Sequence, residues 1–82
     1  FTPNGDGLND FFMPAIMGVE NFRFTIYNRW GEMIFESRDI YKGWDGRYKD
    51  NKCQQDVYVW KIEFLDIASG EERYYIGHVN LI

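Results

Sequence analysis

A strict alternation of residue types over positions 21–27 constrains the fold of this chain more than any other feature. Apolar side chains occupy every second position, at Phe22, Phe24 and Ile26. This period is typical of a strand with one buried face. Gly31 can then adopt the positive φ of a bulged hairpin loop, and residues 33–36 resume as a return strand. We therefore predict a β-hairpin over residues 21–36.

A second alternating segment covers residues 57–65. One of its faces carries Tyr58, Trp60, Ile62 and Phe64. A turn is expected over residues 68–71, followed by a last strand over residues 73–81. One side of that strand carries Tyr75, Val79 and Leu81. Residues 37–56 are rich in Gly, Asp and Asn, and we expect a long loop there with one short strand near Trp44.

No segment keeps a 3.6-residue period over a dozen residues, so the chain is predicted to be all-β. The simplest architecture is a small immunoglobulin-like β-sandwich of antiparallel strands. The 82 residues suffice for a single domain, residues 1–82. A domain of this size buries only about 60% of its unfolded surface. The lone Cys53 excludes an internal disulfide, so an aromatic content of 20% supplies the large core side chains instead.

The acidic balance of the chain limits its partners. The formal net charge is -4 at pH 7, whereas nucleic acid and anionic membranes require a basic face. We therefore expect no nucleic-acid partner and no direct membrane insertion. No run approaches the roughly 18 apolar residues of a transmembrane helix, and the N-terminus lacks the pattern of a secretory signal. Because the chain opens on Phe1, we expect it to be a piece of a longer protein.

The loop over residues 4–10 is the densest cluster of oxygen ligands. Side chains and one carbonyl match four ligand positions of a helix-loop calcium site, namely Asn4, Asp6, Leu8 and Asp10. Met13 stands where such a site carries a bidentate Glu. The favoured interpretation is therefore an Asx-rich turn held by its own side chains, with calcium as the alternative. No cofactor is required.

Two tryptophans lie on predicted loops. Trp44, before Asp45-Gly46, is either the sugar-stacking residue of a binding module or, more commonly, a core residue beside a turn. Trp30 at the hairpin tip has the same two interpretations, with Arg29 stacked across its ring or bonded to a carboxylate. These aromatic residues are candidates for a binding face.

Catalytic residues are not evident. His78 is the single histidine, and no Ser or Cys can be placed as its nucleophile. One Cys and one His cannot supply a tetrahedral zinc site. Paired carboxylates would need a deep cleft, which a domain of this size seldom offers. We predict that the protein is not an enzyme.

Five motifs in order along the chain point to one family. They are Phe1-Thr2-Pro3-Asn4-Gly5-Asp6-Gly7-Leu8-Asn9-Asp10, Ile26-Tyr27-Asn28-Arg29-Trp30-Gly31-Glu32, Gly43-Trp44-Asp45-Gly46, Gln55-Asp56-Val57-Tyr58-Val59-Trp60-Lys61 and Gly77-His78-Val79-Asn80-Leu81-Ile82. In these motifs the chain resembles the gliding motility-associated C-terminal domain of Bacteroidota, the type B sorting domain of the type IX secretion system. The resemblance covers essentially the whole chain.

The resemblance implies a non-catalytic secretion signal at the C-terminal end of a large parent protein. The parent would pass through the periplasm and across the outer membrane to the cell surface or medium. The implied partners are the type IX translocon and an outer-membrane protein of the PorP/SprF type. The residues that we expect to contact a partner are Arg29, Trp30, Trp44, Gly77, Val79 and Leu81. The alternative function is a carbohydrate-binding or adhesive module on the cell surface.

Overall fold

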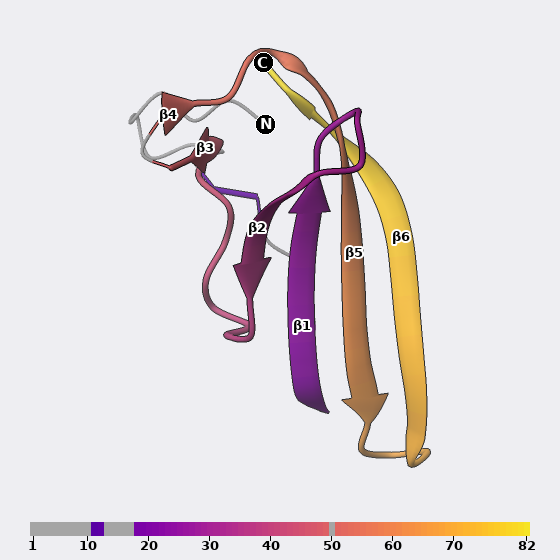
Figure 1. The fold of residues 1–82 in the computed structure, drawn as a ribbon. Coiled ribbons are helices and arrows are strands. Elements are labelled where there is room, and N and C mark those ends of the chain that lie inside the picture. The colour runs from indigo at the N-terminus through magenta and orange to yellow at the C-terminus, as the bar shows by residue number, and fades with distance from the viewer. Residues whose placement is uncertain (1–10, 13–17, 50) are drawn as a thin grey trace.

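The computed structural model describes residues 11–12, 18–49 and 51–82, and these residues form strands and loops without a helix (Figure 1). The strands are β1 (Val19–Tyr27), β2 (Met33–Ser37), β3 (Arg47–Tyr48), β4 (Asn51–Lys52), β5 (Asp56–Asp66) and β6 (Glu71–Leu81). Four strands form one sheet in the order β2-β1-β5-β6, and β3 pairs with β4. All of these pairs are antiparallel. The prediction of an antiparallel all-β fold is confirmed.

The predicted hairpin is the pair β1 and β2. Its loop is held by Asn28, whose Oδ1 accepts hydrogen bonds from the backbone N–H groups of Trp30 (3.0 Å) and Glu32 (2.9 Å). Gly31 has a φ of 81°, which a residue with a side chain rarely adopts. The register shifts between Ile26 and Tyr27, so this edge of the sheet carries a bulge.

The pair β5 and β6 is the longest and most regular in the fold. Its register runs without a shift from Asp56 opposite Leu81 to Asp66 opposite Glu71. The turn between the strands ends at Gly70, whose φ is 70°. β6 therefore lies along one edge of the sheet for its full length, with β2 at the opposite edge (Figure 1).

One face of the sheet, here called the inner face, carries the core. The buried apolar residues are Phe22, Phe24, Ile26, Ile34, Trp44, Tyr58, Ile62, Phe64 and Leu81. The alternation within β1 and β5 predicted most of this set correctly. On the inner face the rings of Phe24 and Phe35 meet edge to face at 5.7 Å between centroids. Aromatic pairing therefore contributes to a core that no disulfide supports.

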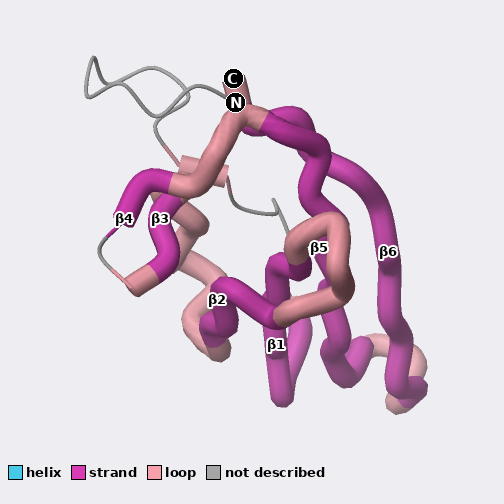
Figure 2. Tube along the Cα trace, turned by 45° about the horizontal axis from the view of Figure 1, so that its top comes forward, coloured by secondary structure: helices cyan, strands magenta, loops and turns pink. Residues whose placement is uncertain are grey.

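The connection from β2 to β5 packs against the inner face. Phe12 and Trp44 form an isolated antiparallel bridge, with N–H···O distances of 2.7 and 2.8 Å between their backbones. Where one short strand was expected near Trp44, the chain forms this bridge and the two-residue strands β3 and β4 (Figure 2). Positive φ values at Gly46 (80°) and Lys49 (52°) turn the chain too sharply for a longer strand. The four-stranded sheet and this smaller layer are compatible with the predicted sandwich.

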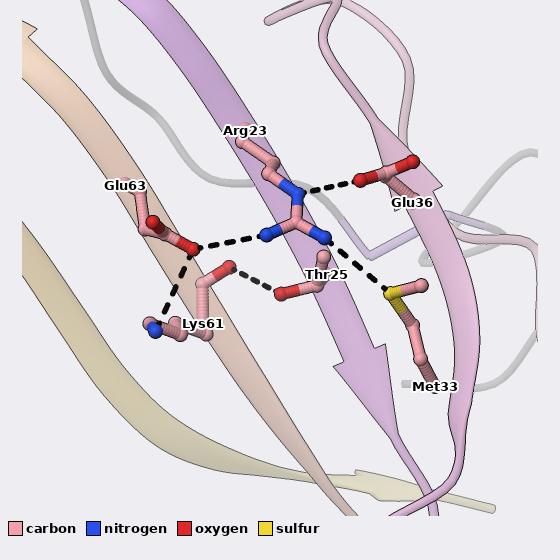
Figure 3. Close-up of polar contacts among 6 residues, drawn as sticks. All are labelled: Arg23, Thr25, Met33, Glu36, Lys61 and Glu63. Carbon is pink, nitrogen blue, oxygen red and sulfur yellow. Dashed lines mark hydrogen bonds and ion pairs between the residues drawn. The ribbon is translucent and has the colours of Figure 1, made fainter.

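The outer face of the sheet carries a charged network centred on Arg23 (Figure 3). The Arg23 guanidinium forms ion pairs with Glu36 on β2 and with Glu63 on β5, the latter at 3.4 Å. Lys61 lies 3.5 Å from the same Glu63 carboxylate. A side-chain hydrogen bond from Arg23 holds the pKa of Glu36 below its ordinary value. The network ties β1 to both of its neighbours across the solvent-facing side.

Candidate recognition surface

The outer edge of β6 is the longest accessible strand edge among the described residues. Within the described part of the chain, β6 pairs with β5 alone. Edge strands are normally protected by Lys, Pro or a bulge. β6 contains no Lys, no Pro and no register shift, and its charged side chains are confined to Glu71, Glu72 and Arg73. The segment from Tyr74 to Val79, here called the open edge, therefore exposes backbone N–H and C=O groups without these protections.

Exposed apolar side chains accompany the open edge. Tyr74 is 65% exposed, Tyr75 53% and Ile76 58%. Tyr75 stacks on Phe64 with 5.9 Å between ring centroids, and Lys61 lies over the ring of Tyr74 at 5.6 Å. Sequence reasoning did not name these three residues as contact candidates, because alternation alone does not reveal which strand will lie at an edge. The absence of Lys and Pro from the segment was the available signal.

The predicted contact residues on β6 lie within or beyond this edge. Gly77 and Val79 are half-buried, whereas Leu81 is buried in the core. Gly77 faces Trp60 across the β5–β6 pair, and Val79 faces Tyr58. Gly77 and Val79 can therefore contact a partner through their main-chain N–H and C=O groups more readily than through their side chains. The side chain of Leu81 contributes to stability.

Arg29 and Trp30 lie together at the tip of the β1–β2 hairpin. The Trp30 side chain is 75% exposed, and the Arg29 guanidinium lies 5.6 Å from the centroid of its ring. Arg29 Nη1 also lies 3.4 Å from Asp56 Oδ2 at the start of β5. Both interactions that the sequence suggested for Arg29, stacking and pairing with a carboxylate, are therefore present. An exposed aromatic ring beside a cation is a common anchor in protein interfaces.

Asp56 connects the hairpin tip to the end of β6. It pairs in register with Leu81, and its carboxylate accepts hydrogen bonds from the Val57 N–H (2.8 Å) and from Gln54 (3.2 Å). The backbone hydrogen bond from Val57, together with Gln54 and Arg29, holds the pKa of Asp56 below its ordinary value. Arg29 and Leu81 consequently lie at the same end of the sheet.

Trp44 is a core residue. Its side chain is fully buried, its Nε1 donates a hydrogen bond to the Arg47 carbonyl (3.1 Å), and its ring meets Tyr58 edge to face at 5.0 Å. In this conformation the Trp44 ring offers no face to a sugar or a protein. The structure thus separates the two loop tryptophans that the sequence treated alike.

The remaining candidate residues do not converge on a reactive centre. The predicted calcium ligands Asn4, Asp6, Leu8 and Asp10 lie outside the described residues. Among the residues that are described, no three His, Cys, Asp or Glu side chains cluster as a metal site. Cys53 is a half-buried free thiol, and burial raises its pKa. No helix in the described part of the chain is long and apolar enough to cross a membrane.

These observations define a class of protein, a small antiparallel β domain whose accessible features are suited to recognition. The family model of the CHU_C type IX secretion signal domain matches residues 1–81, and the chain belongs to this family. The resemblance seen in the sequence is confirmed. Membership implies a secretion signal that engages the type IX machinery in export across the outer membrane. No curated protein and no solved structure gives a significant match.

Proposed function

We propose that the chain is a non-catalytic signal that the type IX machinery recognises as a folded domain. The observation that carries this proposal is the open edge of β6, from Tyr74 to Val79. An extended segment of a partner would add to this edge as a further strand, with main-chain hydrogen bonds supplying affinity. The exposed side chains of Tyr74 and Ile76 would then supply specificity through contacts on the outer face.

The hairpin tip provides the second contact in this proposal. Arg29 and Trp30 lie at the end of the sheet where β6 finishes, so one partner can contact the tip and the edge together. The partner is a translocon component or an outer-membrane protein of the PorP/SprF type. The cargo is the parent protein, which carries this domain at its C-terminal end. It reaches the cell surface or medium by way of the periplasm.

The carbohydrate-binding alternative depended on accessible loop aromatic residues and on the calcium loop, and it is weaker because Trp44 is buried. Trp30 alone is accessible, and the adjacent Arg29 already lies over its ring. A single aromatic ring partly covered by a cation gives a sugar little surface on which to stack. We therefore favour the recognition of a protein.

The test is export of a passenger protein fused to the N-terminal side of the chain, in a bacterium that has a type IX system. Deleting residues 73–82 would remove the buried Leu81 and most of β6, so loss of export would also follow from unfolding. A sharper variant is Tyr74→Lys/His78→Lys, which places two cations on exposed positions of the edge strand, the first of them opposite Glu63 on β5. Export should fall about tenfold, as expected when about 1.4 kcal/mol of binding free energy is lost.

The matched control is Ile67→Lys/Ala68→Lys, which adds two cations at exposed positions of the β5–β6 turn. This control should be exported like the parent chain, and both variants should keep the parental unfolding temperature. Export of the edge variant at the parental level would refute recognition through β6. A fusion with the unmodified chain that stays inside the cell would refute the signal function itself.

A further inference from the structure

A hollow of about 680 Å³ lies on the side of the molecule opposite to β6. The connection between β2 and β5 forms most of its wall, with Phe11 and Phe35 contributing from outside that connection. Figures 1 and 2 both place β3 and β4, which belong to this connection, on the β2 side of the main sheet and away from β6. We call this site the basic hollow, and define it by Phe11, Phe35, Tyr41, Lys42, Arg47 and Lys49.

The three cations of the basic hollow have no carboxylate partner among the described residues. By contrast, ion pairs engage the cations of the four-stranded sheet and of its hairpin tip, namely Arg23, Arg29, Lys61 and Arg73. Lys42, Arg47 and Lys49 are exposed and form none with a described residue. The Lys49 ammonium lies over the ring of Tyr48 at 5.2 Å.

The two acidic residues in the wall are already engaged by the backbone. Asp39 Oδ1 accepts a hydrogen bond from the Tyr41 N–H (2.9 Å), and Asp45 Oδ1 accepts one from the Arg47 N–H (3.0 Å). Each carboxylate thus stabilises the turn on which a neighbouring residue of the hollow is presented. A hydrogen bond to the backbone leaves a carboxylate charged, so the three cations and two carboxylates of the wall give the hollow a formal charge of +1, in a chain whose formal net charge is -4.

Exposed aromatic surface lies beside these cations. Tyr41 is 81% exposed and Phe11 60% exposed. A backbone hydrogen bond from the Lys42 N–H to the Asp39 carbonyl (3.1 Å) closes the turn that carries Tyr41. The bond from the buried Trp44 ring to the Arg47 carbonyl fixes the other wall. The backbone of the site is thus held in place before any ligand arrives, which reduces the entropic cost of binding.

We infer that the basic hollow binds an acidic segment of a protein partner, with an apolar side chain of that segment against Tyr41 and Phe11. Charge complementarity favours an anionic partner. A protein is favoured over an anionic polysaccharide because aromatic residues with arginine are enriched in protein interfaces and because proteins recognise a secretion signal. The inference rests on the proposed signal function but not on the open edge of β6.

Binding can be measured by titrating the 82-residue chain with a synthetic heptapeptide in which Glu alternates with Leu. Counterparts with Gln in place of Glu, and a sulfated dextran, serve as competing probes. The variant Lys42→Glu/Arg47→Glu is compared with Arg38→Glu/Lys52→Glu, which makes the same charge change at exposed positions outside the hollow. The hollow variant should bind the acidic peptide about tenfold more weakly, and the control within about twofold of the parent chain.

Four outcomes would overturn the inference. The first is that the hollow variant and the control variant lose the same amount of affinity for the acidic peptide, and the second is that the chain binds the Glu and Gln peptides equally. The third is that Tyr41→Ser leaves peptide binding unchanged, and the fourth is that the chain binds the sulfated dextran more tightly than the peptide. Tyr41→Ser also tests the site if the charge reversal unfolds the chain. A parent fusion that fails to be exported refutes the signal function. Export retained by a hollow variant that has lost peptide binding refutes only the role of the hollow in export.

Discussion

Gly77 on β6 lies directly against the indole ring of Trp60 on β5. A Cβ atom at Gly77 would come within 3.0 Å of Cζ2, Cε2 and Nε1 of that ring. The two residues face each other in register across the β5–β6 pair. An aromatic ring that covers a cross-strand glycine compensates for the packing that the glycine lacks. The close approach, and not a positive φ, is therefore what requires glycine at this position.

Gly77→Ala should destabilise the domain by about 1–3 kcal/mol, since overpacking forces the ring or the strand to move. Urea unfolding monitored by tryptophan fluorescence measures the change. In a Trp60→Leu background the same substitution should cost clearly less, because the obstructing ring is gone and the two effects become non-additive. Additive costs in the double variant would contradict the steric explanation.

The two loop tryptophans should respond in opposite ways to truncation. Trp44→Ala removes a fully buried side chain and should cost about 3–5 kcal/mol, a large part of the stability of a small domain. Trp30→Ala removes an exposed side chain and should change stability by no more than about 0.5 kcal/mol. The passenger fusion then separates the two roles, because Trp30→Ala should reduce export while the domain stays folded. If the Trp30→Ala domain is stable and its fusion is fully exported, the hairpin tip is not part of the proposed contact.

The Arg23 network should contribute a small, salt-sensitive stabilisation. Its side chains are 31–38% exposed, so solvent screens each ion pair. Arg23→Ala should lower the free energy of unfolding by up to about 1 kcal/mol at low ionic strength, and by less in 1 M salt. Lys52→Ala is the control, since Lys52 is exposed on β4, away from the Arg23 network, and forms no ion pair with a described residue. A loss for Arg23→Ala that does not vary with salt would indicate packing of its aliphatic stem instead.

The buried phenol of Tyr58 should make the fold sensitive to alkaline pH. Burial, with Cys53 and Asp56 nearby, raises the pKa of Tyr58 to about 12, against about 10 in an unfolded chain. The folded state favours the neutral phenol, so this contribution is complete below pH 10. It is lost as the pH rises from about 10 through about 12, by up to roughly 2–3 kcal/mol.

Tyr58→Phe isolates this effect from other groups that titrate at high pH. The variant loses the hydrogen bond from the Tyr58 hydroxyl to the Gln54 carbonyl (2.7 Å) and should be about 1 kcal/mol less stable at neutral pH. The difference between the two proteins should shrink, and then reverse, between pH 10 and 12. A constant difference over that range would show that Tyr58 does not titrate with the fold.

The strands of the main sheet could be predicted because their signals are local. Alternation placed β1 and β5 within two residues of their observed ends, and Gly31 marked the hairpin loop. The same rule was less informative for β6. It grouped Tyr75, Val79 and Leu81 on one side, yet their exposure ranges from 53% for Tyr75 to 5% for Leu81. The second layer covers only part of the inner face, and a period of two carries no information about where that cover ends.

The sequence by itself determined the all-β class, the hairpin, the long strands and the family. These properties depend on residue periods and motifs that can be compared along the chain. Only the tertiary structure decided that Trp44 is buried while Trp30 is exposed, that β6 lies at an edge, and that Lys42, Arg47 and Lys49 share a hollow with Tyr41. The physical reason is that burial and proximity depend on which distant segments pack together, and neighbouring residues do not encode that information.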